Sequence, residues 1–120
     1  MIRAYKIFTG ADGHTHLETG TVAEGIFSKV QQVRFKETPA PAGYDWHTAP
    51  TTQYVLTLTG TLAFVMFSGE RFILKPGDVL LAMDTTGSGH KWELIGDEPW
   101  KRVYVLFNPE DEINFILDSQ

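Results

Sequence analysis

The chain has 120 residues, of which 42% are apolar, and a formal net charge of −5, because 15 acidic residues outnumber 10 lysines and arginines. It contains no cysteine, which excludes disulfides, iron–sulfur clusters, thiolate nucleophiles and thiolate zinc sites. Any metal ion must therefore be held by histidine, carboxylate, amide or water. The acidic balance leaves no basic surface to neutralise phosphates, so we expect no nucleic-acid partner.

Size and hydropathy predict one domain with no membrane partner. The longest purely apolar run, residues 79–83, is far shorter than the ~20 residues of a transmembrane helix, and the N-terminus lacks a signal-peptide pattern. We therefore expect a cytoplasmic protein. At this length one core can bury roughly two thirds of the unfolded surface, so residues 1–120 are expected to form a single domain.

The N-terminal third alternates apolar and polar residues with a period of two, which is typical of strands. Residues 2–8 and 14–18 are predicted to be strands, and residues 25–36 a longer one. The Pro-Ala-Pro-Ala-Gly sequence at 39–43 cannot sit inside a sheet. We interpret it as a loop that leads to a functional rim.

Short strands and glycine turns continue along the rest of the chain. Residues 54–58 are predicted to pair with residues 62–67 in a hairpin closed at Gly60. A further hairpin turn at residues 68–69 is predicted to lead into residues 71–74, and residues 75–78, with the sequence KPGD, are a strong turn signal in which Gly77 permits a positive φ. Turns about every 8–12 residues are typical of an all-β sandwich or barrel. The other predicted strands are residues 71–74, 79–83, 91–95 and 102–107, of which 79–83 is expected to be buried on both faces.

The C-terminal segment carries signals for a helix. Asn108 suits an N-cap, Pro109 suits the first helical position, and the acidic residues 110–112 favour the positive end of a helix dipole. Ile113, Ile116 and Leu117 would share one helical face. The sequence thus predicts a short helix over residues 108–117, packed on the outside of the barrel.

Two histidines fall on faces that can line an internal cavity. If residues 47–59 run extended, His47 and Gln53 share one face, whereas Tyr54 points to the other. His90 shares its face with the apolar residues Trp92 and Leu94. In a small closed barrel, the mixed face of a central strand can line a ligand cavity.

The segment from Pro41 to Leu94 resembles the two-motif signature of the cupin superfamily. The first motif, G-x5-H-x-H-x3-4-E-x6-G, aligns on His47 and Gly60, with Ala49 and Gln53 where the family has His and Glu. The second motif, G-x5-7-P-x-G-x2-H-x3-N, matches at Gly77, Gly87 and His90, with Thr85 and Leu94 in place of Pro and Asn. Residues 74–79, with the sequence LKPGDV, are also typical of cupins.

The resemblance implies an all-β fold, the double-stranded β-helix or jelly-roll barrel of cupins. It also implies a candidate metal site at His47, Gln53 and His90, where metal-dependent cupins place three His and one Glu. This atypical, incomplete ligand set could hold Zn, Ni, Fe or Mn, but a neutral amide binds a cation less tightly than a carboxylate. Cupins of this size commonly pair, so a homodimer is expected.

Two further residues could supply a missing ligand. His16 forms an i, i+2 pair with His14, which a strand would place on one face, although two surface histidines on an exposed edge are the simpler interpretation. Asp84 follows the strand at residues 79–83, and its simpler interpretation is a turn residue whose carboxylate accepts local backbone N–H groups.

Three functions remain open at this point. The first is a metal-dependent cupin enzyme that acts on a small polar organic molecule. The second is a metal-free cupin in which His and Gln bind a small-molecule ligand by hydrogen bonds, as a binding module or an acid–base isomerase. The third assigns these residues to the barrel framework alone.

Overall fold

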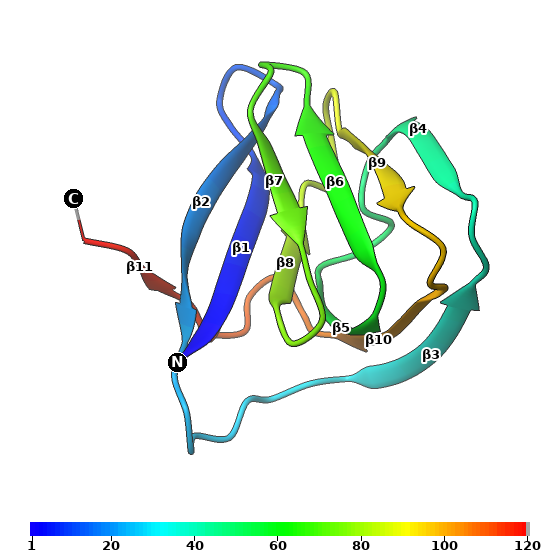
Figure 1. The fold of residues 1–120 in the computed structure, drawn as a ribbon. Helices are drawn as coiled ribbons and strands as arrows, with labels where there is room; N and C mark the ends of the chain where they lie inside the picture. The colour runs from blue at the N-terminus through cyan, green and yellow to red at the C-terminus, as the bar shows by residue number, and fades with distance from the viewer. Residues whose placement is uncertain (120) are drawn as a thin grey trace.

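The computed structural model describes residues 1–119, which form two β-sheets packed as a sandwich (Figure 1). A seven-stranded sheet has the order β11-β2-β1-β8-β5-β10-β3, and a four-stranded sheet has the order β4-β9-β6-β7. Every strand pair is antiparallel except β1 with β8. The strands are β1 (Ile2–Thr9), β2 (Thr15–Val22), β3 (Gln32–Thr38), β4 (Gly43–His47), β5 (Gln53–Thr59), β6 (Thr61–Met66), β7 (Arg71–Leu74), β8 (Val79–Met83), β9 (His90–Ile95), β10 (Trp100–Leu106) and β11 (Ile116–Leu117).

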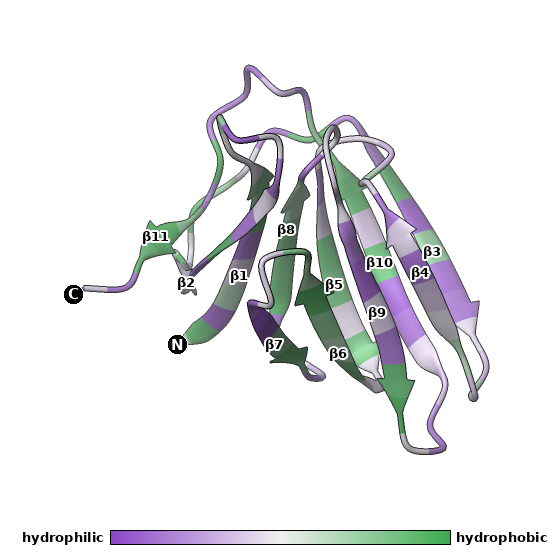
Figure 2. Cartoon of the chain, turned by 90° about the horizontal axis from the view of Figure 1, so that it is seen from above, coloured by the Kyte–Doolittle hydropathy of each residue, from purple (hydrophilic) through white to green (hydrophobic). Residues whose placement is uncertain are grey.

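The main core lies between the two sheets. It is made by residues from strands of both layers, including Ile7, Leu62, Phe64, Leu74 and Leu80. Hydropathy follows this arrangement, since the strands β8 and β6 in the middle of the molecule are largely hydrophobic, whereas the outer strands β3 and β4 carry more hydrophilic residues (Figure 2). The prediction that β8 is buried on both faces is confirmed, because four of its five residues are buried and it lies between β1 and β5.

A second apolar cluster covers the outer face of the seven-stranded sheet. Tyr54 and Leu81 pack there with Phe107, away from the space between the sheets. The predicted outward direction of Tyr54 is therefore confirmed. Ile113 and Phe115 of the C-terminal segment pack onto this cluster and cover part of that outer face.

The predicted C-terminal helix is wrong, because residues 1–119 contain no helix. The segment 108–117 instead forms a turn at residues 109–111, an irregular stretch over 112–115 and the short strand β11. Ile113 and Phe115 pack on the outer cluster, and Asn114 exchanges hydrogen bonds with the backbone of Ala23 at 2.7 and 3.1 Å. Pairing of β11 with β2 satisfies the backbone farther on. These tertiary contacts outweigh local helix signals, which contribute only about 1 kcal/mol each. Since no helix is formed within residues 1–119, none there is long and apolar enough to cross a membrane.

The predicted hairpin between residues 54–58 and 62–67 is also wrong. β5 pairs with β8 and β10 in one sheet, and β6 pairs with β7 and β9 in the other. The chain crosses between the layers at Gly60, whose φ of +95° is a conformation that L side chains rarely adopt. A glycine turn therefore ends β5 as expected, but it joins two sheets instead of two paired strands.

The strand predicted at residues 25–36 is shorter than expected. It covers Gln32–Thr38, where the register with β10 begins at Gln32 opposite Leu106. Residues 23–31 cross from β2 to β3 without regular structure, so alternation alone overstated the strand. The turns at Gly69 and Gly77 have the positive φ expected of them, and β6 and β7 form the predicted hairpin.

Candidate functional site

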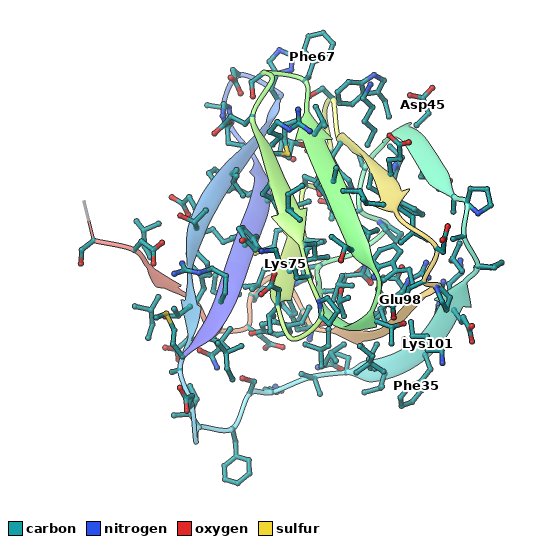
Figure 3. All side chains as sticks on the ribbon, in the orientation of Figure 1. Phe35, Asp45, Phe67, Lys75, Glu98 and Lys101 are labelled. Carbon is teal, nitrogen blue, oxygen red and sulfur yellow. The ribbon has the colours of Figure 1, made fainter. Side chains whose placement is uncertain are left out.

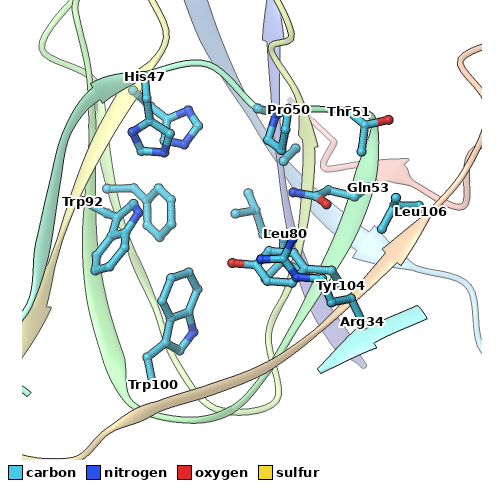
Figure 4. Close-up of a pocket in the computed structure, with 15 residues that line it drawn as sticks. Arg34, His47, Pro50, Thr51, Gln53, Leu80, Trp92, Trp100, Tyr104 and Leu106 are labelled. Carbon is cyan, nitrogen blue, oxygen red and sulfur yellow. The ribbon is translucent and has the colours of Figure 1, made fainter. Parts of the chain in front are cut away.

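A cavity of about 260 Å³ opens between the two sheets (Figure 4). Its wall is largely apolar and aromatic, with Phe64, Trp92, Trp100 and Tyr104 contributed by three strands. Its polar side chains are few and come from β3, β4, β5 and β9, together with the hydroxyl of Tyr104 on β10 and Thr51 in the loop before β5. A small apolar cavity with a few convergent polar groups is the usual form of a small-molecule site.

His47 and His90 meet at one end of this cavity. They face each other across the β4–β9 ladder, and their ring centroids lie 4.4 Å apart. Gly89 makes this approach possible, because it has a φ of +74° and a Cβ atom there would collide with the carbonyl group of His47. The two motif histidines are thus brought together, as the sequence predicts.

His90 is oriented by a buried carboxylate. Its Nδ1–H group donates to Oδ2 of Asp84 over 2.6 Å, and the hydroxyl of Thr15 donates to the same oxygen over 2.9 Å. Asp84 is fully buried, and its Oδ1 atom has no hydrogen-bond partner among the described residues. In a neutral His90 this hydrogen bond places the proton on Nδ1 and the lone pair on Nε2, and the His90 side chain lines the cavity.

Asp84 itself differs from its expected role as a local turn residue. Its carboxylate accepts from side chains on β2 and β9, not from nearby backbone N–H groups. It does not line the cavity. The end of a strand could be predicted at Asp84, but Thr15 could not be identified as its partner, since 69 residues separate the two.

His47 is held in the same tautomer by a different acceptor. Its Nδ1–H group donates to the backbone carbonyl of Asp45 over 2.7 Å. Partial burial lowers the pKa of His47 from its ordinary value of 6.5, and the neighbouring His90 acts in the same direction. A neutral His47 therefore presents a second Nε2 lone pair beside that of His90.

Gln53 completes the polar side of the cavity. Its side chain extends from β5 toward the open space (Figure 4). It is only 6% exposed, yet no hydrogen bond joins its amide to another residue in the range 1–119. An amide with both donor and acceptor capacity is available to a bound molecule.

The histidines of β2 and the preceding turn lie elsewhere. His16 bonds to Asp12 over 2.9 Å, and the ring of His14 stacks on Phe67 with its Nδ1 atom 3.0 Å from the Ser88 hydroxyl. Neither histidine lines the cavity. The structure therefore brings together His47, Gln53 and His90 but leaves His16 apart from them.

Arg34, Trp100 and Tyr104 line the cavity although sequence reasoning did not single them out. The guanidinium carbon of Arg34 lies 5.2 Å from the centre of the Tyr104 ring. The available signal was the alternation of Trp100, Arg102 and Tyr104 along β10, which places all three on one face. Arg34 could be placed only through the pairing of β3 with β10.

The donor set fits a divalent cation only in part. Two Nε2 atoms and one amide oxygen can be offered, and the Asp84–His90 hydrogen bond is the kind that orients a metal-ligating histidine. However, no group of three or more His, Asp or Glu side chains in residues 1–119 is arranged to hold a metal ion. With no anionic ligand lining the cavity, the site does not fit the tight four-ligand metal centre that the family resemblance implies.

Comparison with protein-family models and with curated proteins gave no match for the chain.

Proposed function

We propose that this protein is a small cupin whose barrel lumen binds a small organic molecule and moves a proton on it. The observation that carries the proposal is the 2.6 Å hydrogen bond from His90 to the buried Asp84, which leaves the Nε2 lone pair of His90 at the wall of a cavity. The antiparallel-rich two-sheet sandwich and the sequence motifs around His47 and His90 support the double-stranded β-helix assignment.

The proposed chemistry is a proton transfer with His90 as the base. Nε2 of His90 accepts a proton from a carbon next to a carbonyl group, and the electron pair moves onto the carbonyl oxygen as an enolate forms. Asp84 stabilises the imidazolium ion that results, and the Gln53 N–H group donates to the enolate oxygen. In a β,γ-unsaturated carbonyl compound the enolate is conjugated, and return of the same proton to the γ-carbon shifts the double bond into conjugation with the carbonyl group, which completes an isomerisation with no other reactant.

A neutral ketone tests this chemistry without requiring the natural substrate. Phenylacetone is incubated with the protein in D₂O, and loss of its benzylic protons is followed by NMR. We expect the wild-type protein and a His16→Gln control to accelerate the exchange, and His90→Gln to remove the acceleration. Equal exchange rates with wild-type protein and His90→Gln would rule out His90 as the base.

A divalent cation is the second candidate, favoured by the two adjacent Nε2 lone pairs. His47, His90 and Gln53 would hold a transition metal such as Zn, Ni, Fe or Mn, with water completing the shell. When bound, such an ion would polarise a carbonyl or hydroxyl oxygen of the ligand. Calorimetric titration with Zn²⁺ and Ni²⁺ tests this: heat of binding that disappears in His90→Ala supports it, and no heat with either metal contradicts it.

We also propose a homodimer through the seven-stranded sheet. Val33, Phe35 and Leu58 share its outer face and are 53%, 76% and 57% exposed. β3 lies at the edge of that sheet and pairs only with β10. A second copy placed against this edge would cover both the free backbone groups of β3 and the apolar side chains beside them.

A further inference from the structure

We propose that the lumen takes a ligand with a carboxylate at one end of a small apolar or aromatic body, and that Arg34 and Tyr104 hold the carboxylate. This inference rests on the proposed function of the lumen as a small-molecule site. Beyond that function, we infer the charge and shape of the ligand and the direction in which it binds.

The cavity carries positive charge that no acidic side chain balances. Arg34 lines it, and Arg102, only 3% exposed, has its guanidinium carbon 3.8 Å from the centre of the Trp100 ring, which also lines the cavity. Neither arginine forms an ion pair with a carboxylate of residues 1–119. No Asp or Glu lines the cavity, and the nearby Asp84 is already bonded to His90. In a protein with a net charge of −5, this concentration of unpaired guanidinium groups favours an anionic ligand.

Tyr104 lines the cavity and contacts both arginines. Its hydroxyl oxygen accepts a 2.9 Å hydrogen bond from Nε of Arg102. The hydroxyl proton has no acceptor among the described residues, so it can be donated to a ligand oxygen. Arg102 is held in place by Thr38 at 2.6 Å and by the carbonyl of Trp100 at 3.0 Å. The Arg34 guanidinium and the Tyr104 hydroxyl thus form two donors suited to one carboxylate.

The middle of the cavity fits the apolar part of such a ligand. Trp92 and Trp100 contact each other edge to face with ring centroids 4.9 Å apart, and Phe64 lies beside Trp100. The volume of about 260 Å³ lies below the ~300–1,000 Å³ of drug-sized pockets. It is therefore suited to a single ring or a short aliphatic chain, not to a nucleotide.

The two polar ends of the cavity set the direction of binding. Arg34 and Tyr104 lie on the side opposite His47 (Figure 4). A ligand whose carboxylate meets Arg34 places the far end of its apolar body near the histidines. The reacting carbon would then be separated from the carboxylate by the apolar body.

Binding of matched acids and amides tests the proposal. Benzoate, phenylacetate and hexanoate are each compared with the corresponding neutral amide, by tryptophan fluorescence and by calorimetry on the full chain. Fluorescence is informative because two of the three tryptophans line the cavity. Arg34→Gln, Arg34→Lys and Tyr104→Phe are compared with Lys101→Gln, which makes the same charge change at an exposed position of β10.

We expect at least one acid to bind roughly tenfold or more tightly than its amide, and Arg34→Gln to remove that preference. Tyr104→Phe and Arg34→Lys should weaken the acid by a smaller factor, whereas Lys101→Gln should leave it unchanged. If acids and amides bind equally, or if none of the acids binds, the carboxylate inference is overturned. The phenylacetone exchange that tests the proposed function uses a neutral probe, so the two can fail independently.

Discussion

The Nδ1 atom of His90 and the Oδ2 atom of Asp84 lie 2.6 Å apart, with Asp84 fully buried and His90 only 4% exposed. This contact joins the start of β9 to the residue that follows β8. It orients the imidazole ring, and it also links two strands that belong to different sheets. One interaction therefore serves both the site and the packing of the two layers.

Asp84→Asn tests the structural part of this link. Replacing the carboxylate by an amide keeps the shape but removes the charge-assisted hydrogen bonds from His90 and Thr15. We expect the free energy of unfolding to fall by about 1.5–3 kcal/mol. Urea denaturation measures this change. Asp97→Asn, the same substitution in an exposed turn, should stay within about 0.5 kcal/mol of wild type; equal effects of the two variants would contradict the role of Asp84.

Because its pKa is lowered, His47 should make the folded protein less stable in mild acid. Burial lowers the pKa of His47 below its ordinary 6.5, with His90 acting in the same direction and the Asp45 carbonyl and Asp84 opposing it. As the pH falls below about 6.5, His47 in the unfolded chain therefore becomes protonated while His47 in the folded protein is still neutral. Because the unfolded state binds more protons, the free energy of unfolding falls. We expect His47→Gln to reduce the loss of stability between pH 7.5 and 5. A variant as acid-sensitive as wild type would show that His47 does not contribute.

For His16 we expect the opposite pH dependence of stability, so it serves as a comparison for His47. The hydrogen bond to Asp12 raises the pKa of His16 above 6.5. The stability that protonated His16 contributes is present in full at pH values below its pKa in the unfolded chain. It is lost as the pH rises through the higher pKa of His16 in the folded protein. His16→Gln should therefore reduce stability more at pH 5 than at pH 8, as measured by thermal unfolding in matched buffers.

Phe35→Glu tests the proposed dimer. Phe35 is 76% exposed and points away from the body of the sandwich on β3 (Figure 3). A charge at the centre of a dimer contact would have to be desolvated without a partner, which costs several kcal/mol. Light scattering after size exclusion should show a dimer for wild type and a monomer for Phe35→Glu. Phe27→Glu, on the exposed crossing segment between β2 and β3, is the control; a monomeric wild type at micromolar concentration would refute the dimer.

The double substitution Ala49→His with Gln53→Glu tests whether the lumen preserves the shape of a metal site. Both positions line the cavity, and in the cupin motif that the sequence resembles they are occupied by His and Glu. Adding an imidazole and a carboxylate to His47 and His90 should raise the affinity for Zn²⁺ or Ni²⁺ by orders of magnitude. Calorimetry on the double variant and on each single variant measures the gain. If the metal affinity does not increase, the side chains at positions 47, 49, 53 and 90 do not converge on one metal ion.

Local chemistry was sufficient to predict much of the framework. The period-two alternation placed the strands around Tyr54, Val79 and Lys91, because side chains alternate between the two faces of any strand whatever its neighbours. The same rule assigned Tyr54 to the outer face and His90 to the inner one. The glycine turns at Gly60 and Gly77 were also predictable, since glycine has no Cβ atom and can adopt a positive φ without steric cost.

Strand pairing and long-range partners were not predictable from these local patterns. Adjacent strands at Gly60 suggested a hairpin, yet β5 and β6 belong to different sheets. The cap and dipole signals at Asn108 favoured a helix, but packing of Phe115 on the outer cluster and pairing of β11 with β2 hold the segment in a non-helical conformation. Such outcomes depend on burial energies between residues far apart in the chain, which no local window contains.

The sequence alone determined that any metal must lack thiolate ligands, because composition is a property of the chain itself, and its spacing singled out His47 and His90 through their resemblance to a motif. Only the tertiary structure decided which groups surround them. It placed the carboxylate of Asp84 behind His90, left the amide of Gln53 facing the cavity, and brought Arg34 from an edge strand to the far side of the lumen. The physical reason is that strand pairing and sheet packing, and not sequence separation, set the distances over which charges and hydrogen bonds act.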